Sequence, residues 1–182
     1  MNLKHQVIAF AVGSLFAGAV FAQGATSKVA VGNINQTQTA IGAQQTMDLG
    51  NAKGAGAKTD VTLKNVTQSQ TGAMANQKMA IGNATGQGAQ SKVVAGNVTQ
   101  TQAGAGAQQK MEIGNAKGQG ASANVKAGNI TQTQAGLGAK QEMGIGNATG
   151  QGAKSQVTVG NVKQSQTAAG ATQKMNVGNA TN

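Results

Sequence analysis

The sequence repeats itself every 32 residues, and this period limits the folds that the chain can adopt. Asparagine recurs along the chain with gaps that alternate between 18 and 14 residues. The positions are Asn33, Asn51, Asn65, Asn83, Asn97, Asn115, Asn129, Asn147, Asn161 and Asn179. Glycine precedes each of them except Asn65, which follows Lys64. A fixed period of this length is the signature of a repeat architecture.

Each repeat divides in the same way. The five copies span residues 26–57, 58–89, 90–121, 122–153 and 154–182. Each contains a 13-residue segment and a nine-residue segment, separated by five-residue turns rich in glycine. Glycine permits the positive φ that tight chain reversals require. We therefore expect residues 23–182 to form one domain of five equivalent units, each with two long strand segments.

The nine-residue segment alternates with a period of two residues. Its second, fourth, sixth and eighth positions are constant in character, whereas the positions between them vary. The constant columns are Gln45, Gln77, Gln109, Gln141 and Gln173; Met47, Met79, Met111, Met143 and Met175; Leu49, Ile81, Ile113, Ile145 and Val177; and Asn51, Asn83, Asn115, Asn147 and Asn179. A constant face that alternates with a variable face predicts a half-buried β-strand.

The 13-residue segment also alternates, but its phase shifts by one residue after the Gly-Asn pair. A valine column precedes the Asn column of Asn33, Asn65, Asn97, Asn129 and Asn161. The shifted column after it holds Gln36, Gln68, Gln100, Gln132 and Gln164, and a second Gln column follows two residues later. We expect a bulge or bend at Gly-Asn that lets both halves point inward. The alternative keeps one phase and buries the Thr column instead.

A single repeat contains too few apolar side chains to offset the entropy lost on ordering its backbone. Stacking supplies the difference through backbone ladders and side-chain columns spaced about 4.8 Å apart. A buried amide can donate to its copy on one side and accept from its copy on the other. The Gln and Asn columns therefore predict stacking ladders, although amides that only solvate a surface are the alternative. The predicted fold is all-β, a five-rung β-solenoid or stacked β-arch, with its handedness open.

The first 22 residues have the pattern of a secretory signal peptide. Lys4 is followed by an apolar run over residues 7–21, and the small residue Ala22 ends it. A transmembrane anchor is the alternative, but the run is short for one. We expect cleavage after residue 22 and secretion of residues 23–182.

The remaining composition argues against several classes of site. Residues 23–182 contain no aromatic residue, histidine, cysteine, proline or arginine, and they carry 13 lysines against four acids. This predicts no disulfide framework, no ordinary transition-metal site and no Ser-His or Cys-His nucleophile. It also predicts no base-stacking platform for sequence-specific nucleic-acid binding. We expect neither an enzyme nor a cofactor.

The repeats begin soon after the expected cleavage site and run to residue 180 with no capping segment between them and either end. Monomeric solenoids need polar caps, and open edge strands template further chains. We therefore expect end-to-end assembly into a homopolymer. The lysines are expected to decorate the surface, with Glu142 between Lys110 and Lys174 if the rungs stack in register. Their net charge would also attract anionic polymers without specificity.

Segments such as Gln141 with Gly146-Asn147-Ala148, and Gly96-Asn97-Val98-Thr99-Gln100, resemble the curlin repeats of bacterial functional amyloids. The longer repeat is also similar to that of Fap-type fibril subunits. The resemblance covers the whole of residues 23–182. It implies export through the outer membrane, polymerisation on a nucleator subunit, and extracellular fibres for biofilm matrix and adhesion. Curlin repeats are shorter, usually include some aromatic residues, and follow a leader stretch that here is reduced to residues 23–26.

Other functions are compatible with parts of the pattern. An ice-binding β-solenoid would use Thr99 with Thr101 and Thr131 with Thr133 as a regular hydroxyl face, which Lys163 interrupts. A monomeric cell-surface adhesin would be expected to carry an insertion that breaks the repeat, and the sequence has none. A disordered secreted polymer would not maintain such strict alternation.

Overall fold

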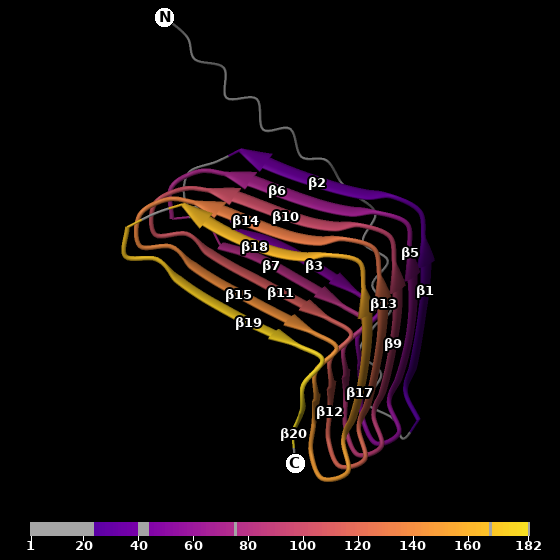
Figure 1. The fold of residues 1–182 in the computed structure, drawn as a ribbon. Coiled ribbons are helices and arrows are strands. Elements are labelled where there is room, and N and C mark those ends of the chain that lie inside the picture. Colours follow the sequence, from indigo (N-terminus) through magenta and orange to yellow (C-terminus); the bar gives the residue numbers. More distant parts are fainter. Residues whose placement is uncertain (1–23, 40–43, 75, 168, 182) are drawn as a thin grey trace, which may run out of the picture.

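The computed structural model describes residues 24–39, 44–74, 76–167 and 169–181, and every regular element in these ranges is a β-strand. The strands form four parallel five-stranded sheets, and each rung contributes one strand to each sheet (Figure 1). The predicted all-β, five-rung solenoid is confirmed. The predicted signal peptide lies outside the described residues.

The sheets are named here by their strands. Sheet A contains β1 (Thr26–Val31), β5 (Lys58–Leu63), β9 (Gln90–Ala95), β13 (Ser122–Ala127) and β17 (Lys154–Val159). Sheet B contains β2 (Ile34–Thr39), β6 (Val66–Thr71), β10 (Val98–Ala103), β14 (Ile130–Ala135) and β18 (Val162–Thr167). Sheet C contains β3 (Gln44–Leu49), β7 (Asn76–Ile81), β11 (Gln108–Ile113), β15 (Lys140–Ile145) and β19 (Thr172–Val177). Sheet D contains β4 (Ala52–Lys53), β8 (Ala84–Thr85), β12 (Ala116–Lys117), β16 (Ala148–Thr149) and β20 (Ala180–Thr181).

Every strand pairs in register with its copy one repeat away. Met79 lies opposite Met111, and Gln100 lies opposite Gln132, as the 32-residue period requires. Because the register equals the repeat, each sequence column becomes a straight column of side chains along the stacking axis. In the constant Gln, Met and Asn columns, identical residues therefore meet at every step of the stack.

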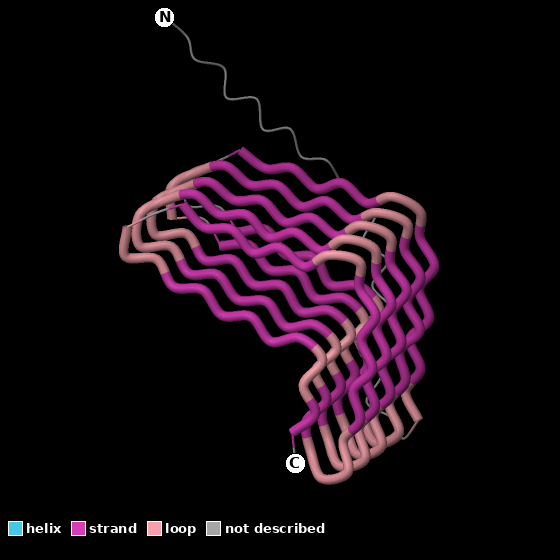
Figure 2. The backbone as a smooth tube through the Cα atoms, viewed as in Figure 1, coloured by secondary structure: helices cyan, strands magenta, loops and turns pink. Residues whose placement is uncertain are grey.

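Each rung has two arms, which Figure 2 shows in outline. The chain runs along sheet A, turns into sheet B, reverses into sheet C and bends again into sheet D. Sheets B and C face each other and form the long arm, whose core joins valine, methionine, leucine and isoleucine side chains from sheets A, B and C. Sheet D lies beside the start of sheet A and forms the short arm, where Ala116 and Ala148 pack with Ala121 and Ala123.

The bend expected in the 13-residue segment is present and separates sheet A from sheet B. In β6, Val66, Gln68 and Gln70 are buried, whereas Thr67 and Ser69 on the outer face are half-buried. Both halves therefore point inward, and the alternative with a buried Thr column is wrong. None of the residues at this first corner has a positive φ, so Lys64 can replace glycine there.

The nine-residue segment, by contrast, is not the single strand that its parity predicts. The glycines at its second corner, Gly50, Gly82, Gly114, Gly146 and Gly178, have φ between 58° and 65°. This left-handed conformation turns the chain, so the following asparagine lies at the corner and the next alanine points inward. Each rung therefore has three six-residue strands and one two-residue strand, instead of two long segments.

Candidate functional site: the stacking ladders and the face of the last rung

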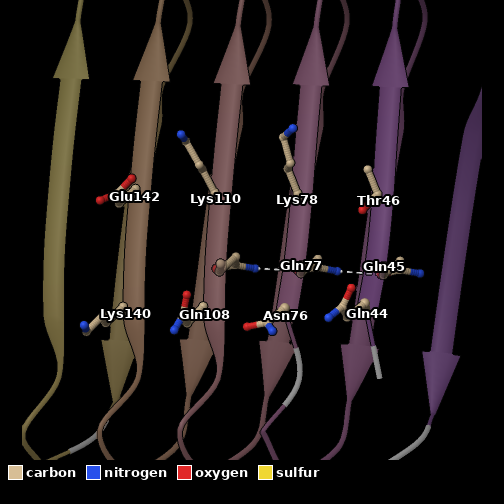
Figure 3. Close-up of a pocket in the computed structure, with 11 residues that line it drawn as sticks. Gln44, Gln45, Thr46, Asn76, Gln77, Lys78, Gln108, Lys110, Lys140 and Glu142 are labelled. Atoms are coloured by element: carbon tan, nitrogen blue, oxygen red, sulfur yellow. Dashed lines mark hydrogen bonds between the residues drawn. The ribbon is translucent and has the colours of Figure 1, made fainter. Parts of the chain in front are cut away.

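The Gln column of sheet C forms a continuous hydrogen-bonded ladder inside the long arm. Each Nε2 donates to the Oε1 of the preceding rung at 2.8–2.9 Å, from Gln173 through Gln141, Gln109 and Gln77 to Gln45. All of these residues except Gln173 are buried. Figure 3 shows the ladder running across the strands of sheet C between two columns of outward side chains.

The predicted Gln column of sheet B stacks in the same way and also binds the opposite sheet. The amide groups of Gln36, Gln68, Gln100, Gln132 and Gln164 are joined at 2.9–3.1 Å. In addition, Gln100 Nε2 donates to the carbonyl oxygen of Lys110 in sheet C at 3.2 Å, and Gln68 does the same to Lys78. This column therefore links successive rungs and holds the two sheets of the long arm together.

The second Gln column of sheet B, which contains Gln70, Gln102 and Gln134, was not among the predicted ladder residues. Its amides stack at 3.1–3.4 Å, and these three residues are buried. Gln134 Nε2 also donates to Ala107 O, at the end of the turn between sheets B and C, at 2.9 Å. The same parity that identified the first column contains the signal for this one.

The two Asn columns differ from the prediction of buried amide ladders. At the second corner Asn51, Asn83, Asn115 and Asn147 are half-buried, and Asn179 is exposed. At the first corner Asn33, Asn65, Asn97, Asn129 and Asn161 are all exposed.

Their main contact is with the backbone. From Asn51 and Asn65 up to the fourth rung, the Oδ1 of each Asn accepts the main-chain N–H of the next Asn in the same column, at 2.8–3.2 Å. Amide-to-amide contacts form at the first corner, where Asn65 Nδ2 donates to Asn33 Oδ1 and Asn161 Nδ2 donates to Asn129 Oδ1. The asparagines therefore satisfy backbone donors at the corners, where strand pairing is interrupted.

The apolar columns of sheet C fill the core of the long arm, except in the last rung. Met47, Met79, Met111 and Met143 are buried, as are Ile81, Ile113 and Ile145. Leu49 and Val177 are half-buried, and Met175 is 41% exposed. The fifth rung therefore presents at its outer face the side chains that the middle rungs bury completely.

Sequence reasoning missed the short arm. Ala84, Ala116 and Ala148 of sheet D are buried, and so are Ala89 and Ala121 at the ends of the turns that lead into sheet A. Alanine follows every Asn of the second corner and ends every glycine-rich turn. These constant alanines could have indicated a second buried interior. Alanine is also common in ordinary turns, however, so the pattern was not distinctive.

The hydroxyl groups of the short arm were missed as well. Thr59 and Ser91 both donate to Gly82 O, and Ser155 donates to Gly146 O. These contacts hold sheet A against the second corner.

The charged side chains lie on outer faces. Glu142 is in register between Lys110 and Lys174, as expected for parallel stacking. On this outer face of sheet C, however, Lys110 Nζ pairs with Glu112 Oε1 of its own strand, at 2.9 Å. An open groove of about 360 Å³ lies on this face among residues such as Gln44, Lys78 and Lys140 (Figure 3). Within the described ranges, no three His, Cys, Asp or Glu residues gather in a metal-binding arrangement.

No family model, no curated protein and no solved structure matches the chain. The described residues also include no helix long and apolar enough to cross a membrane. The curlin-like and Fap-like resemblance therefore stays a prediction, and the functional argument depends on the geometry of the ladders.

Proposed function

We propose that residues 23–182 are secreted and assemble end to end into extracellular, amyloid-like fibres of a biofilm matrix or adhesive surface. The observation that carries this proposal is the outer face of the fifth rung. Met175 is 41% exposed there, whereas Met111 in the same column of the third rung is fully buried. Among the described strands, β17, β18, β19 and β20 each pair with only one neighbour. A second copy stacked on this face would bury Met175 and pair all four strands.

The direction of the ladders favours a head-to-tail arrangement. In the three buried Gln columns, Nε2 donates toward the preceding rung, so the ladders end at the Oε1 atoms of Gln164, Gln166 and Gln173. A further rung would supply donors to these acceptors. The first rung of a second copy has Nε2 atoms at Gln36 and Gln45 in the matching columns. Two fifth rungs placed face to face would instead bring acceptor against acceptor.

Backbone pairing would continue across the same junction. β1 of the second copy would add to β17, and the equivalent strands would add to sheets B, C and D. Unpaired strand edges are templates for this kind of addition. The resulting fibre would have strands perpendicular to its axis, which is the cross-β arrangement. By the curlin-like resemblance, its assembly would use a nucleator subunit and an outer-membrane export system.

The proposal is tested on purified residues 23–182 after removal of denaturant. We expect filaments by electron microscopy, with fibre-diffraction reflections at about 4.7 Å and about 10 Å. A soluble, folded β-rich monomer that remains monomeric at high concentration would contradict the proposal.

A matched pair of variants tests whether growth uses the face of the fifth rung. Met175→Lys places a charge on a side chain that the monomer exposes and the fibre would bury, so it should permit folding but abolish elongation. Met74→Lys is the control, because Met74 is 72% exposed in the turn between β6 and β7 of the second rung, three rungs from the fifth. Elongation is followed by sedimentation after seeding with wild-type fibres. If both variants elongate equally, the fifth rung is not the growing end.

An ice-binding function is the second candidate, supported by the outer face of sheet B. Thr67, Thr99 and Thr131 form a parallel column there, and Ser69, Thr101 and Thr133 form another. Lys163 continues the first column and interrupts the hydroxyl pattern. Thermal hysteresis in the wild type that is lost in a Thr99→Lys, Thr131→Lys variant would favour this function over a purely structural one.

A further inference from the structure

The outer face of sheet A carries one lysine from every rung. These residues are Lys28, Lys58, Lys92, Lys126 and Lys154, and all of them are exposed. Their position within the strand varies over three outward columns, but their number per rung does not. Because rungs in a parallel sheet are about 4.8 Å apart, this face presents one positive charge at each step along the stacking axis, in one of three columns.

Only one acid opposes these lysines on the described face of sheet A. Asp60 lies in register between Lys28 and Lys92, and Lys92 Nζ is 3.9 Å from its Oδ2. The side chains of Lys92 and Asp60 are 60% and 43% exposed, so solvent screens this contact. The face as a whole therefore keeps a large excess of positive charge.

The other sheets have a smaller excess of positive charge, and sheet D carries only Lys53 and Lys117 among its described residues. On the outer face of sheet C, Lys78, Lys110, Lys140 and Lys174 are opposed by Asp48, Glu112 and Glu142. The outer face of sheet B has Lys163 as its one charged residue among those described. Since no described sheet face is net negative, another copy of the chain offers no complementary surface, and the complementary partner is a different, anionic molecule.

We propose that the outer face of sheet A binds a linear acidic polysaccharide that lies along the stacking axis. A band of exposed ammonium groups suits a flexible chain of carboxylates, because lysine acts as a point charge without directional demands. Nucleic acid is disfavoured by two features of residues 23–182. They contain no aromatic residue on which bases could stack and no arginine to bind phosphate in a bidentate manner.

This binding face is complete in a single chain, so the inference does not depend on fibre formation. If copies do stack, the band continues from one copy to the next, and binding gains from multivalency. The face is also separate from the stacking surface, because its lysines point out of sheet A while the ladders lie inside the solenoid.

The test compares two variants of equal net charge. Lys28, Lys92, Lys126 and Lys154 are replaced by glutamine in one, and Lys78, Lys110, Lys140 and Lys174 are replaced by glutamine in the other. Binding of the folded chain to polygalacturonate is measured at low salt and at about 0.5 M NaCl, where charge contacts are screened. Circular dichroism checks that both variants keep the β fold of the wild type.

We expect the sheet A variant to lose about tenfold or more in affinity, and the sheet C variant to lose less than about threefold. Binding by the wild type should weaken strongly at high salt. Equal losses in the two variants would overturn the proposal, because net charge alone would then explain binding. Tighter binding of single-stranded DNA than of polygalacturonate through the same lysines would overturn the polysaccharide assignment.

Discussion

The two arms of each rung have the same parallel register but are filled by different side chains. The long arm is wide enough for methionine and glutamine, and Gln100 spans it to reach the carbonyl oxygen of Lys110. The short arm is filled by alanine, and Ala116, Ala121 and Ala123 are at most 1% exposed. The long arm therefore gains stability from amide hydrogen bonds along the axis, whereas the short arm depends on close backbone approach.

This difference predicts where substitutions are tolerated. An interior that is wide and hydrogen-bonded is sensitive to lost partners and to charge, because a buried polar group without a partner is costly. An interior that is narrow is sensitive to added volume, because the surrounding backbone has little room to move. The arms meet at the second corner, at Gly114 and its equivalents in the other rungs, and this elbow combines the two demands.

The largest effect is expected for a charge inside the long arm. Met111→Asp buries a carboxylate among apolar side chains and should lower the free energy of unfolding by about 3–5 kcal/mol. Thr101→Asp places the same charge on the outer face of sheet B and should cost less than about 1 kcal/mol. Urea denaturation followed by circular dichroism measures both. Similar losses would show that the faces are assigned wrongly.

The next largest effect is expected at the elbow. A Cβ on Gly114 would lie 2.3 Å from Val125 Cγ2, and Gly114 has φ of 63°. Gly114→Ala should therefore cost about 2–4 kcal/mol, from left-handed strain and from overpacking together.

Gly120→Ala is the matched control for this elbow substitution. Gly120 has φ of 67° but no atom within 4 Å of an added Cβ, so only the strain of about 1–2 kcal/mol applies. Thermal unfolding of the two variants separates the contributions. Equal losses would mean that the elbow is not tightly packed.

The elbow is also where sequence reasoning was wrong, and the reason is physical. At the first corner the hydrophobic phase shifts visibly, and Lys64 shows that glycine is not required. At the second corner the parity continues unchanged through Asn115, so the pattern gives no sign that the chain turns at Gly114. The turn depends on a left-handed φ. A constant glycine permits this conformation but does not by itself predict it.

Constancy of a residue has more than one cause in a stacked fold. Gln109 is constant because its amide is buried in a ladder, whereas Asn115 is constant because its Oδ1 accepts the N–H of Asn147 at a corner. Both causes produce the same column in the sequence. The period, the register and the Gln columns were therefore predictable, but the place of the Asn columns and the short arm were not.

A ladder substitution tests the claim that the long arm depends on hydrogen bonds along the axis. Gln109→Met leaves Gln77 Oε1 and Gln141 Nε2 without their partners and should cost about 1–3 kcal/mol. Replacing the whole column, from Gln45 to Gln173, with methionine removes donors and acceptors together. Its cost per residue should therefore be clearly smaller. A loss five times that of the single variant, measured by urea denaturation, would mean that the ladder is not cooperative.

The smallest effect is expected in the short arm, where hydroxyl groups supplement the alanines. Gly82 O accepts from both Thr59 and Ser91, so Ser91→Ala should cost only about 0.5–1 kcal/mol. Ala123 occupies the same column in the fourth rung, and Ala123→Ser should recover a similar amount by donating to Gly114 O.

The double variant, with serine and alanine exchanged between these two rungs, should then have nearly the stability of the wild type. Thermal unfolding of the two single variants and the double variant completes the comparison. If Ala123→Ser instead destabilises the protein by more than about 1 kcal/mol, the added hydroxyl is too large for the space. Volume alone would then decide which substitutions the short arm tolerates. The two arms would differ more in this respect than the hydrogen bond of Ser91 suggests.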